Sequence, residues 1–178
     1  NFLARLYTNT ELRRAFLSEP EKIGAENGLS KTEISEFAEV LPEELNFFAE
    51  SLFWKRLREV EKFLPLTKDS IGNDFIKQFR GFSQTFNPQT VKKHLEDAIG
   101  FCKFLQKKDV SEFNKNIAKF EGKKLEFYGY GKRFAVCRLN YDLREILHRT
   151  TNLQNEFPRR KTISIWFKIG KKIKHFSI

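Results

Sequence analysis

The apolar residues in the first two-thirds of the chain repeat with the period of an α-helix, and this pattern constrains the fold more than any other feature. The clearest run is Val91, Leu95, Ala98, Cys102 and Leu105, at positions i, i+4, i+7, i+11 and i+14. A helix with such a stripe must bury it against a neighbouring element. The sequence therefore predicts a helical bundle over residues 1–122.

Start and stop signals place the first helices of this bundle. Two S-x-x-E capping boxes, which begin at Ser18 and Ser30, predict two short helices that meet at Asn27–Gly28. A long helix is expected to begin at Pro42 and to end at Pro65.

Three further helices are expected before residue 122. One has an apolar stripe over 71–86 and stops near Asn87–Pro88. The second is the 91–105 stripe described above. Asp109 or Ser111 is placed to cap a shorter third helix, whose apolar positions are Phe113, Ile117 and Phe120.

The last third of the chain has the composition of strands. Two β-prone runs flank Gly129 and Gly131 and predict a hairpin. Asp142 is a candidate N-cap for one helix, and the runs KTISIWFKI and KIKHFSI are two more strands joined by a type II′ turn at Gly170–Lys171. We therefore predict an α+β fold, in which the bundle of residues 1–122 is followed by a small antiparallel sheet with one helix in residues 123–178.

The net charge of +10 is concentrated at one end of the chain. Residues 1–122 hold 19 basic and 19 acidic residues, whereas residues 123–178 hold 14 basic and 4 acidic ones. The first fifty residues are acidic, with 5 basic and 10 acidic side chains. This asymmetry predicts a polyanionic partner for the basic part, or docking between the two halves. A basic surface that only keeps the protein soluble is the alternative.

Alternation along residues 162–169 separates two faces of one expected strand. The face expected to join the core comprises Ile163, Ile165, Phe167 and Ile169, and the other comprises Thr162, Ser164, Trp166 and Lys168. If the second face is open, Trp166 is an aromatic platform beside cations, which suits stacked bases and their phosphates. It would equally suit an acidic peptide laid along a sheet edge. The alternative is that Trp166 packs against the helical bundle.

These patterns predict a cytoplasmic, non-catalytic binding protein whose basic C-terminal module recognises a polyanionic partner, with nucleic acid favoured over an acidic protein or peptide. The candidate binding residues are the cations of the last twenty positions together with one tryptophan: Arg159, Arg160, Lys161, Trp166, Lys168, Lys171, Lys172 and Lys174. No catalytic residue, cofactor or metal is expected.

The candidate catalytic and metal-binding patterns are incomplete. Glu145-x-x-His148 matches one half of a carboxylate-bridged metal site, but His94 has Val91 where the second glutamate should lie. His94 and Asp97 share one helix face, and we interpret them as a surface pair.

Other signals for chemistry and targeting are weak. Cys102 and Cys137 form no C-x-x-C pair, so both are interpreted as reduced, partly buried thiols. Gly129–Arg133 could hold a phosphate, but a hairpin turn is the simpler interpretation. No apolar run approaches the ~20 residues of a membrane span, and Arg5 interrupts the apolar stretch at the start, so no signal peptide is expected.

Residues 45–106 contain a series of motifs: an Arg-rich helix that ends in an apolar-Pro pair, Arg56 to Pro65, a Gly-x-x-Phe helix start, Gly72 to Phe75, then Pro88 and Phe104–Leu105. This series resembles the helical N-terminal domain of an uncharacterised bacterial family that is labelled DNA-binding. Members of that family are often accessory partners of enzymes that modify ribosomal peptides. The resemblance implies an alternative function: an accessory or adaptor subunit that presents a peptide substrate to such an enzyme.

Overall fold

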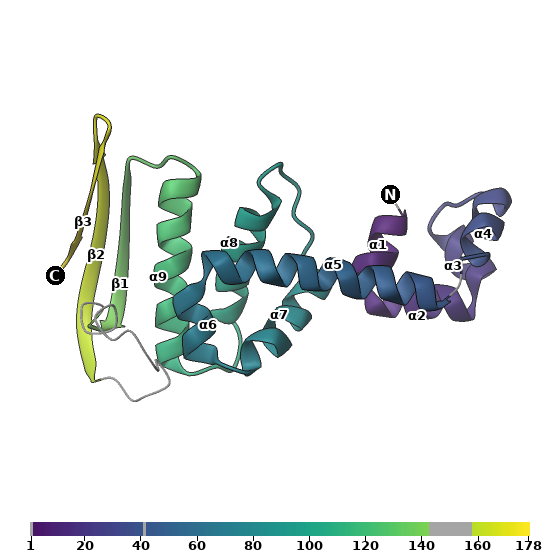
Figure 1. Ribbon diagram of the computed structural model, residues 1–178, viewed down its shortest axis with the longest axis horizontal. Helices are drawn as coiled ribbons and strands as arrows, with labels where there is room; N and C mark the ends of the chain where they lie inside the picture. The colour runs from purple at the N-terminus through teal and green to yellow at the C-terminus, as the bar shows by residue number, and fades with distance from the viewer. Residues whose placement is uncertain (1, 41, 143–157) are drawn as a thin grey trace.

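The computed structural model describes residues 2–40, 42–142 and 158–178, and within these ranges nine helices lead into three strands. The helices are α1 (Phe2–Thr8), α2 (Thr10–Ser18), α3 (Pro20–Glu26), α4 (Lys31–Ala38), α5 (Pro42–Phe63), α6 (Pro65–Ile71), α7 (Asp74–Thr85), α8 (Lys93–Leu105) and α9 (Glu112–Gly129). The strands are β1 (Phe134–Tyr141), β2 (Arg159–Ile169) and β3 (Lys172–Ser177). The α+β fold is thus confirmed, and the molecule is elongated, with the sheet at one end and α1–α4 at the other (Figure 1).

Only one of the two predicted capping boxes forms. Ser30 accepts a hydrogen bond from the Glu33 amide at 3.3 Å, and the Glu33 carboxylate accepts one from the Ser30 amide at 2.8 Å. Gly28 ends the preceding helix with a φ of 78°, a conformation that glycine adopts at little cost. The box at Ser18 is wrong, because Ser18 is still the last residue of α2 and Glu19 becomes the N-cap of α3.

The long helix α5 begins at Pro42 and ends before Pro65, as predicted. The helix expected over 71–86 is instead divided between α6 and α7. Gly72 causes the division, because its φ of 62° lies in the left-handed region where an α-helix cannot continue.

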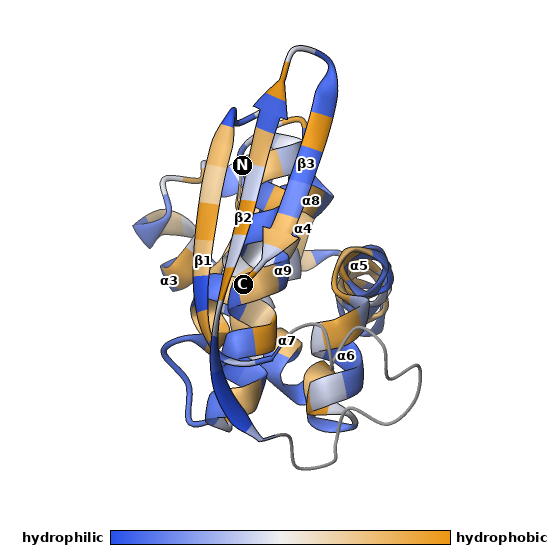
Figure 2. Cartoon of the chain, turned by 90° about the vertical axis from the view of Figure 1, so that its left-hand side faces the viewer, coloured by the Kyte–Doolittle hydropathy of each residue, from blue (hydrophilic) through white to orange (hydrophobic). Residues whose placement is uncertain are grey.

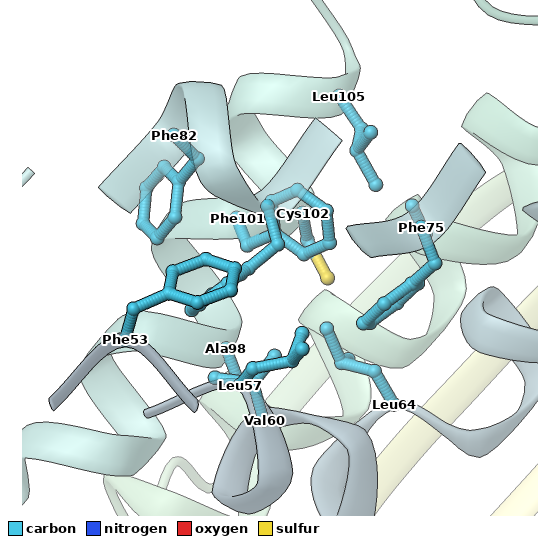
Figure 3. Close-up of a cluster of buried hydrophobic side chains, with 12 residues drawn as sticks. Phe53, Leu57, Val60, Leu64, Phe75, Phe82, Ala98, Phe101, Cys102 and Leu105 are labelled. Carbon is cyan, nitrogen blue, oxygen red and sulfur yellow. The ribbon is translucent and has the colours of Figure 1, made fainter. Parts of the chain in front are cut away.

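Phenylalanine rings from α5, α7 and α8 form the main core of the bundle (Figure 3). Phe101 lies at its centre and meets the rings of Phe75 and Phe79 edge to face, with centroids 5.2 and 5.3 Å apart. The predicted stripe on α8 is buried except for Val91, which precedes the helix and is 98% exposed.

A buried ion pair joins three of these helices. Arg56 of α5 donates to the two carboxylate oxygens of Asp97 on α8, at 2.7 and 3.0 Å. Its second terminal nitrogen, Nη1, donates to the Ser83 carbonyl at 3.4 Å, and Nη2 also donates to the Phe86 carbonyl at 3.0 Å, so Arg56 caps the C-terminal end of α7. The prediction of a surface pair between His94 and Asp97 is therefore wrong, since Asp97 is fully buried and bound by Arg56.

Helix α9 is longer than predicted and extends beyond residue 122. Residues 123–129 were expected to be the first strand of a hairpin, and that prediction is wrong because they form the last two turns of α9. Phe127 is buried against the sheet, and Lys123 pairs with Glu126 three residues later, so tertiary packing and an ion pair both favour the helix.

Two faces of α9 contact different parts of the protein. On one face Gly122 lies so close to α8 that a Cβ atom there would be 2.9 Å from the Cβ of Cys102. On the other face Ile117, Phe120 and Phe127 pack against the sheet. The helix expected after Asp142 falls on residues 143–157 and so lies outside the described residues.

The three strands form an antiparallel sheet in the order β1-β2-β3. A two-residue turn joins β2 to β3, and Gly170, its first residue, has the positive φ of 59° that such a turn requires. Of the four strands expected, three form within the described residues.

Removing the carboxylate of the buried ion pair should destabilise the fold strongly. We expect Asp97→Ala to lower the free energy of unfolding by about 3–5 kcal/mol, because Arg56 would keep a buried charge without a partner. Glu50→Ala is the matched control, since it removes the carboxylate of the exposed Arg80–Glu50 pair and should cost at most about 1 kcal/mol. Urea denaturation measures both, and equal losses would contradict the argument.

Three lysines surround one carboxylate at the end of α9. Lys103, Lys123 and Lys132 lie 3.0, 3.1 and 3.2 Å from the oxygens of Glu126. Burial raises the pKa of Glu126, but the hydrogen bonds from these lysines outweigh it and lower the pKa to about 2. Because the three lysines come from α8, α9 and the loop before β1, the cluster fixes the end of α9 to both neighbours.

The lowered pKa predicts a loss of stability in acid. A carboxylate whose pKa is lower in the folded than in the unfolded state stabilises the protein above its unfolded pKa, here 4.5, and the contribution disappears as the pH falls towards 2. We therefore expect the difference in the free energy of unfolding between the wild type and Glu126→Gln to be constant near neutral pH and to shrink below pH 4.5. A urea denaturation series across pH tests this, and an unchanged difference would refute it.

Candidate functional site

The face of the sheet that contains Trp166 is the buried one. Trp166 is 1% exposed, and its ring lies 5.4 Å from that of Phe120 on α9 and is stacked on His175 at 4.9 Å. Burial lowers the pKa of His175, and the nearby Lys124 lowers it further, which favours the neutral imidazole in this stack. The alternative in which Trp166 packs against the helical part is thus confirmed.

Small polar side chains beside Trp166 allow this face to be buried. The Thr162 hydroxyl donates to the Tyr141 carbonyl at 2.9 Å. The hydroxyls of Ser164 and Ser177 lie 3.0 Å apart and are hydrogen bonded to each other. With their polar atoms satisfied, these residues cost little to bury.

The more apolar face of the sheet therefore points away from the helices, and the prediction that it joins the core is wrong. The strand register places Phe134 of β1 opposite Phe167 of β2, and Phe176 of β3 opposite Ile165. We define the open face by its apolar residues on the three strands: Phe134, Val136, Ile163, Ile165, Phe167, Ile169 and Phe176. Figure 2 looks onto this face, with the helices behind the sheet.

The open face presents a row of three aromatic rings, one from each strand. Phe134 is 61% exposed and Phe176 is 50% exposed, while Phe167 lies between them and is half-buried. The rings of Phe167 and Phe176 are nearly parallel, with an interplanar angle of 9° and centroids 5.7 Å apart. A contiguous exposed apolar patch of this kind is typical of an interaction site.

Cations lie on the same face as these rings. Arg138 is opposite Ile163, Lys174 is opposite Phe167, and Lys172 is opposite Ile169, so each cation adjoins an apolar residue of β2. All three side chains are exposed. The open face is therefore both aromatic and basic.

The structure brings only some of the predicted binding residues together. Lys172 and Lys174 belong to the open face, and Lys161 extends it by alternation from the buried Thr162. Lys168 alternates to the other face, beyond the cover of α9, and Lys171 lies in the turn. Arg159 begins β2 and is exposed, whereas Arg160 lies 3.3 Å from the carboxylate of Asp142. Trp166 is too deeply buried to contact a partner.

The acidic segment of the chain does not neutralise the open face. The acidic first fifty residues comprise α1–α4 and the start of α5, and they lie at the opposite end of the molecule (Figure 1). Within the described ranges, no carboxylate lies within ion-pair distance of Arg138, Lys172 or Lys174. The alternative in which the two halves of one chain dock through their charges therefore has no contact in the part of the chain that the structure describes.

The two cysteines and the candidate metal-binding patterns can be compared with the described residues. Burial raises the pKa of Cys137 to about 11 and also raises that of Cys102, so neither free, buried thiol is a ready nucleophile. No group of three or more His, Cys, Asp or Glu side chains in residues 2–40, 42–142 and 158–178 could hold a metal ion. Glu145 and His148 lie outside those ranges. Nor is any described helix both long and apolar enough to cross a bilayer.

The predicted binding residues include none of the apolar residues of the open face, and among the omissions are its three rings, Phe134, Phe167 and Phe176, and the cation Arg138. The sequence pattern places Phe167 in the core, because its face of the strand is the more apolar one. The same strand contains a signal that points the other way, since Thr162 and Ser164 are small side chains whose hydroxyls can form hydrogen bonds inside a sheet. Phe134 and Arg138 then follow from the pairing of β1 with β2, which the sequence does not specify.

Comparison with known proteins does not add to this geometry. No protein-family model matches the chain, and no curated protein matches it. The resemblance of residues 45–106 to a DNA-binding family therefore stays a prediction.

Substitutions on the two faces of the sheet should differ sharply in their effect on stability. We expect Trp166→Ala to lower the free energy of unfolding by about 3–5 kcal/mol, because it removes a fully buried ring. Phe134→Ala on the open face should cost about 0.5 kcal/mol or less. Chemical denaturation of both variants measures the difference, and a Phe134→Ala cost equal to that of Trp166→Ala would show that the open face is covered in solution.

Proposed function

We propose that the protein binds single-stranded nucleic acid on the open face of its sheet. The observation that supports this proposal is the row formed by Phe134, Phe167 and Phe176, which lies beside Arg138, Lys172 and Lys174 on one exposed surface. Aromatic rings can stack on nucleobases, and the adjacent cations can bind the phosphates that link those bases.

The geometry of the row fits a single strand better than a duplex. A duplex hides the faces of its bases, so flat rings on a sheet can stack only on unpaired bases. Neighbouring strands of a sheet lie about 4.8 Å apart. The ring centroids of Phe167 and Phe176, on adjacent strands, are 5.7 Å apart, which is close to the spacing of the strands. Successive bases can therefore contact successive strands while the backbone passes along the cations.

The charge distribution also supports a polyanion over a neutral partner. The excess of basic side chains falls in residues 123–178, which contain all three strands of the sheet. The acidic first fifty residues lie far from the sheet (Figure 1). An exposed patch with one sign of charge raises the local concentration of an oppositely charged ligand and its rate of association.

Loss of the aromatic row should weaken binding to a single strand. We expect the double variant Phe134→Ala/Phe176→Ala to bind a fluorescein-labelled oligothymidylate or oligouridylate with an affinity lower by roughly a factor of ten or more, since each stacked base contributes about 1–3 kcal/mol. Fluorescence anisotropy measures the affinity. Phe47→Ala is the matched control, because Phe47 is a 69% exposed ring on α5, remote from the sheet.

Salt dependence separates the contribution of the cations from that of the rings. Lys172→Gln/Lys174→Gln should reduce the slope of log affinity against log salt by about 1.4, or 0.7 for each phosphate contact. Lys22→Gln/Lys31→Gln, at the acidic end, should leave the slope unchanged. If the wild type does not bind single strands at low salt, or prefers a duplex, the proposal is wrong.

A second candidate function is the adaptor role, in which an acidic peptide pairs with the free edge of β3. Ile163 and Ile178 exchange two backbone hydrogen bonds, at 2.8 and 3.0 Å. By alternation, the amides of Ile173, His175 and Ser177 point away from β2 and are placed to pair with an added strand. Ile173→Pro distinguishes the two functions, because it removes one of these donors without changing the open face. It should weaken an edge-bound acidic peptide but not an oligonucleotide.

A further inference from the structure

A hollow on the helical side of the protein is separate from the open face. It lies where the end of α5 and the last turn of α9 meet the start of α8, and it has a volume of about 570 Å³. Its lining consists of apolar side chains with three basic ones: Phe63, Val91, Lys92, Lys93, His94, Leu95, Leu125 and Tyr128, together with Gly129. This volume is in the range of sites for small organic ligands, about 300–1,000 Å³.

Close packing of α8 and α9 fixes one wall of this hollow. Gly129 touches Leu95, and a Cβ atom at position 129 would overlap with the Leu95 side chain. Lys92 donates from Nζ to the Gly129 carbonyl at 2.6 Å, which holds the end of α9 to the segment before α8. The wall is therefore set by a steric contact and a hydrogen bond.

Three large apolar side chains of the lining are exposed to solvent. Val91 is 98% exposed, Tyr128 is 48% exposed and Phe63 is 37% exposed. These side chains gain free energy if an apolar group covers them. The hollow can thus hold an apolar body against the helices.

The charge of the rim selects the head group of such a ligand. Lys92 and Lys93 are both exposed at the rim, and the lining contains no carboxylate. His94 lies beside them, with its Nδ1 atom out of solvent and without a hydrogen-bond partner among the described residues. Glu59 lies near enough to His94 to interact with it electrostatically, but its carboxylate is paired with Lys62 at 2.6 Å. A negatively charged head group would therefore meet two ammonium groups and no carboxylate in the lining itself.

We propose that this hollow binds an anionic amphiphile, that is, an aliphatic chain of medium length with one carboxylate or phosphate head. The chain would lie against Val91, Leu125 and Tyr128, and the head group would lie between Lys92 and Lys93. The site shares no residue with the open face, so it is independent of nucleic-acid binding.

A series of ligands tests both parts of this proposal, the binding of the aliphatic chain and the binding of the anionic head group. The probes are hexanoate, octanoate and decanoate, with decyl phosphate to compare head groups and decyltrimethylammonium as the cationic control. Amide chemical shifts of the full chain locate the site by NMR. Shifts should cluster at residues 91–95 and 125–129, affinity should rise about fourfold for each methylene that is buried, and the cationic probe should bind more weakly. Whether decanoate or decyl phosphate binds more tightly identifies the head group.

Matched variants distinguish the hollow from other apolar surfaces. Lys93→Gln should weaken decanoate binding by roughly two- to fivefold, whereas Lys77→Gln, an exposed lysine of α7, should have no effect. Val91→Asp should abolish the cluster of shifts, whereas the same change at Val136 on the open face should not.

Three results would overturn the proposal: shifts confined to the open face, equal binding of anionic and cationic probes, or unchanged binding by Val91→Asp. Because Val91 is almost fully exposed, that variant is expected to fold. These results concern amphiphile binding in the hollow, whereas oligonucleotide binding at the sheet is measured in a separate experiment. One proposal can therefore fail while the other stands.

Discussion

The packing of the sheet on a single helix determines the surface that the protein offers to a partner. Helix α9 contacts α8 through the close approach of Gly122 to Cys102, and it contacts the sheet through Phe120 and Trp166. One helix can cover only one face of a three-stranded sheet, and within the described residues no second layer covers the other face (Figure 2). The open face is therefore a direct consequence of how the bundle and the sheet share α9.

The bundle provides a firm support for that helix. Arg56 joins α5, α7 and α8, and Glu121 of α9 accepts hydrogen bonds from the amides of Leu66 and Thr67 at 3.1 and 2.7 Å. Burial raises the pKa of Glu121, so these amide bonds offset part of the cost of placing its carboxylate inside the protein. Binding sites on rigid elements keep their geometry better than sites on loops. The rings of the open face are thus held by strands that rest on a fixed helix.

The sequence predicted the helices of the bundle better than the faces of the sheet, and the reason is physical. The stripe of α8 and the capping box at Ser30 depend on local spacing, which a sequence states directly. The buried face of β2 depends on which side α9 packs, and alternation gives two faces without choosing between them. The apolar face was the natural choice, yet Thr162 and Ser164 find hydrogen-bond partners inside the sheet, so their face can be buried at little cost. Residues 123–129 differ from the predicted strand for a related reason: Phe127 packs on the sheet from a helix, and this tertiary contact outweighs its β-propensity.

The uneven distribution of charge along the molecule also influences which partners can bind at the open face. The first fifty residues hold 5 basic and 10 acidic side chains and repel a polyanion at their end of the molecule, while the cations near the sheet attract it (Figure 1). Under the proposed function, a strand of nucleic acid is therefore expected at the sheet end of the molecule rather than at the acidic end. The same polarity disfavours two open faces packed against each other, because Arg138, Lys172 and Lys174 of both copies would meet across the interface. A partner that covers the apolar rings and also pairs with these cations would carry negative charge, and the proposed single-stranded nucleic acid supplies both that charge and flat apolar bases.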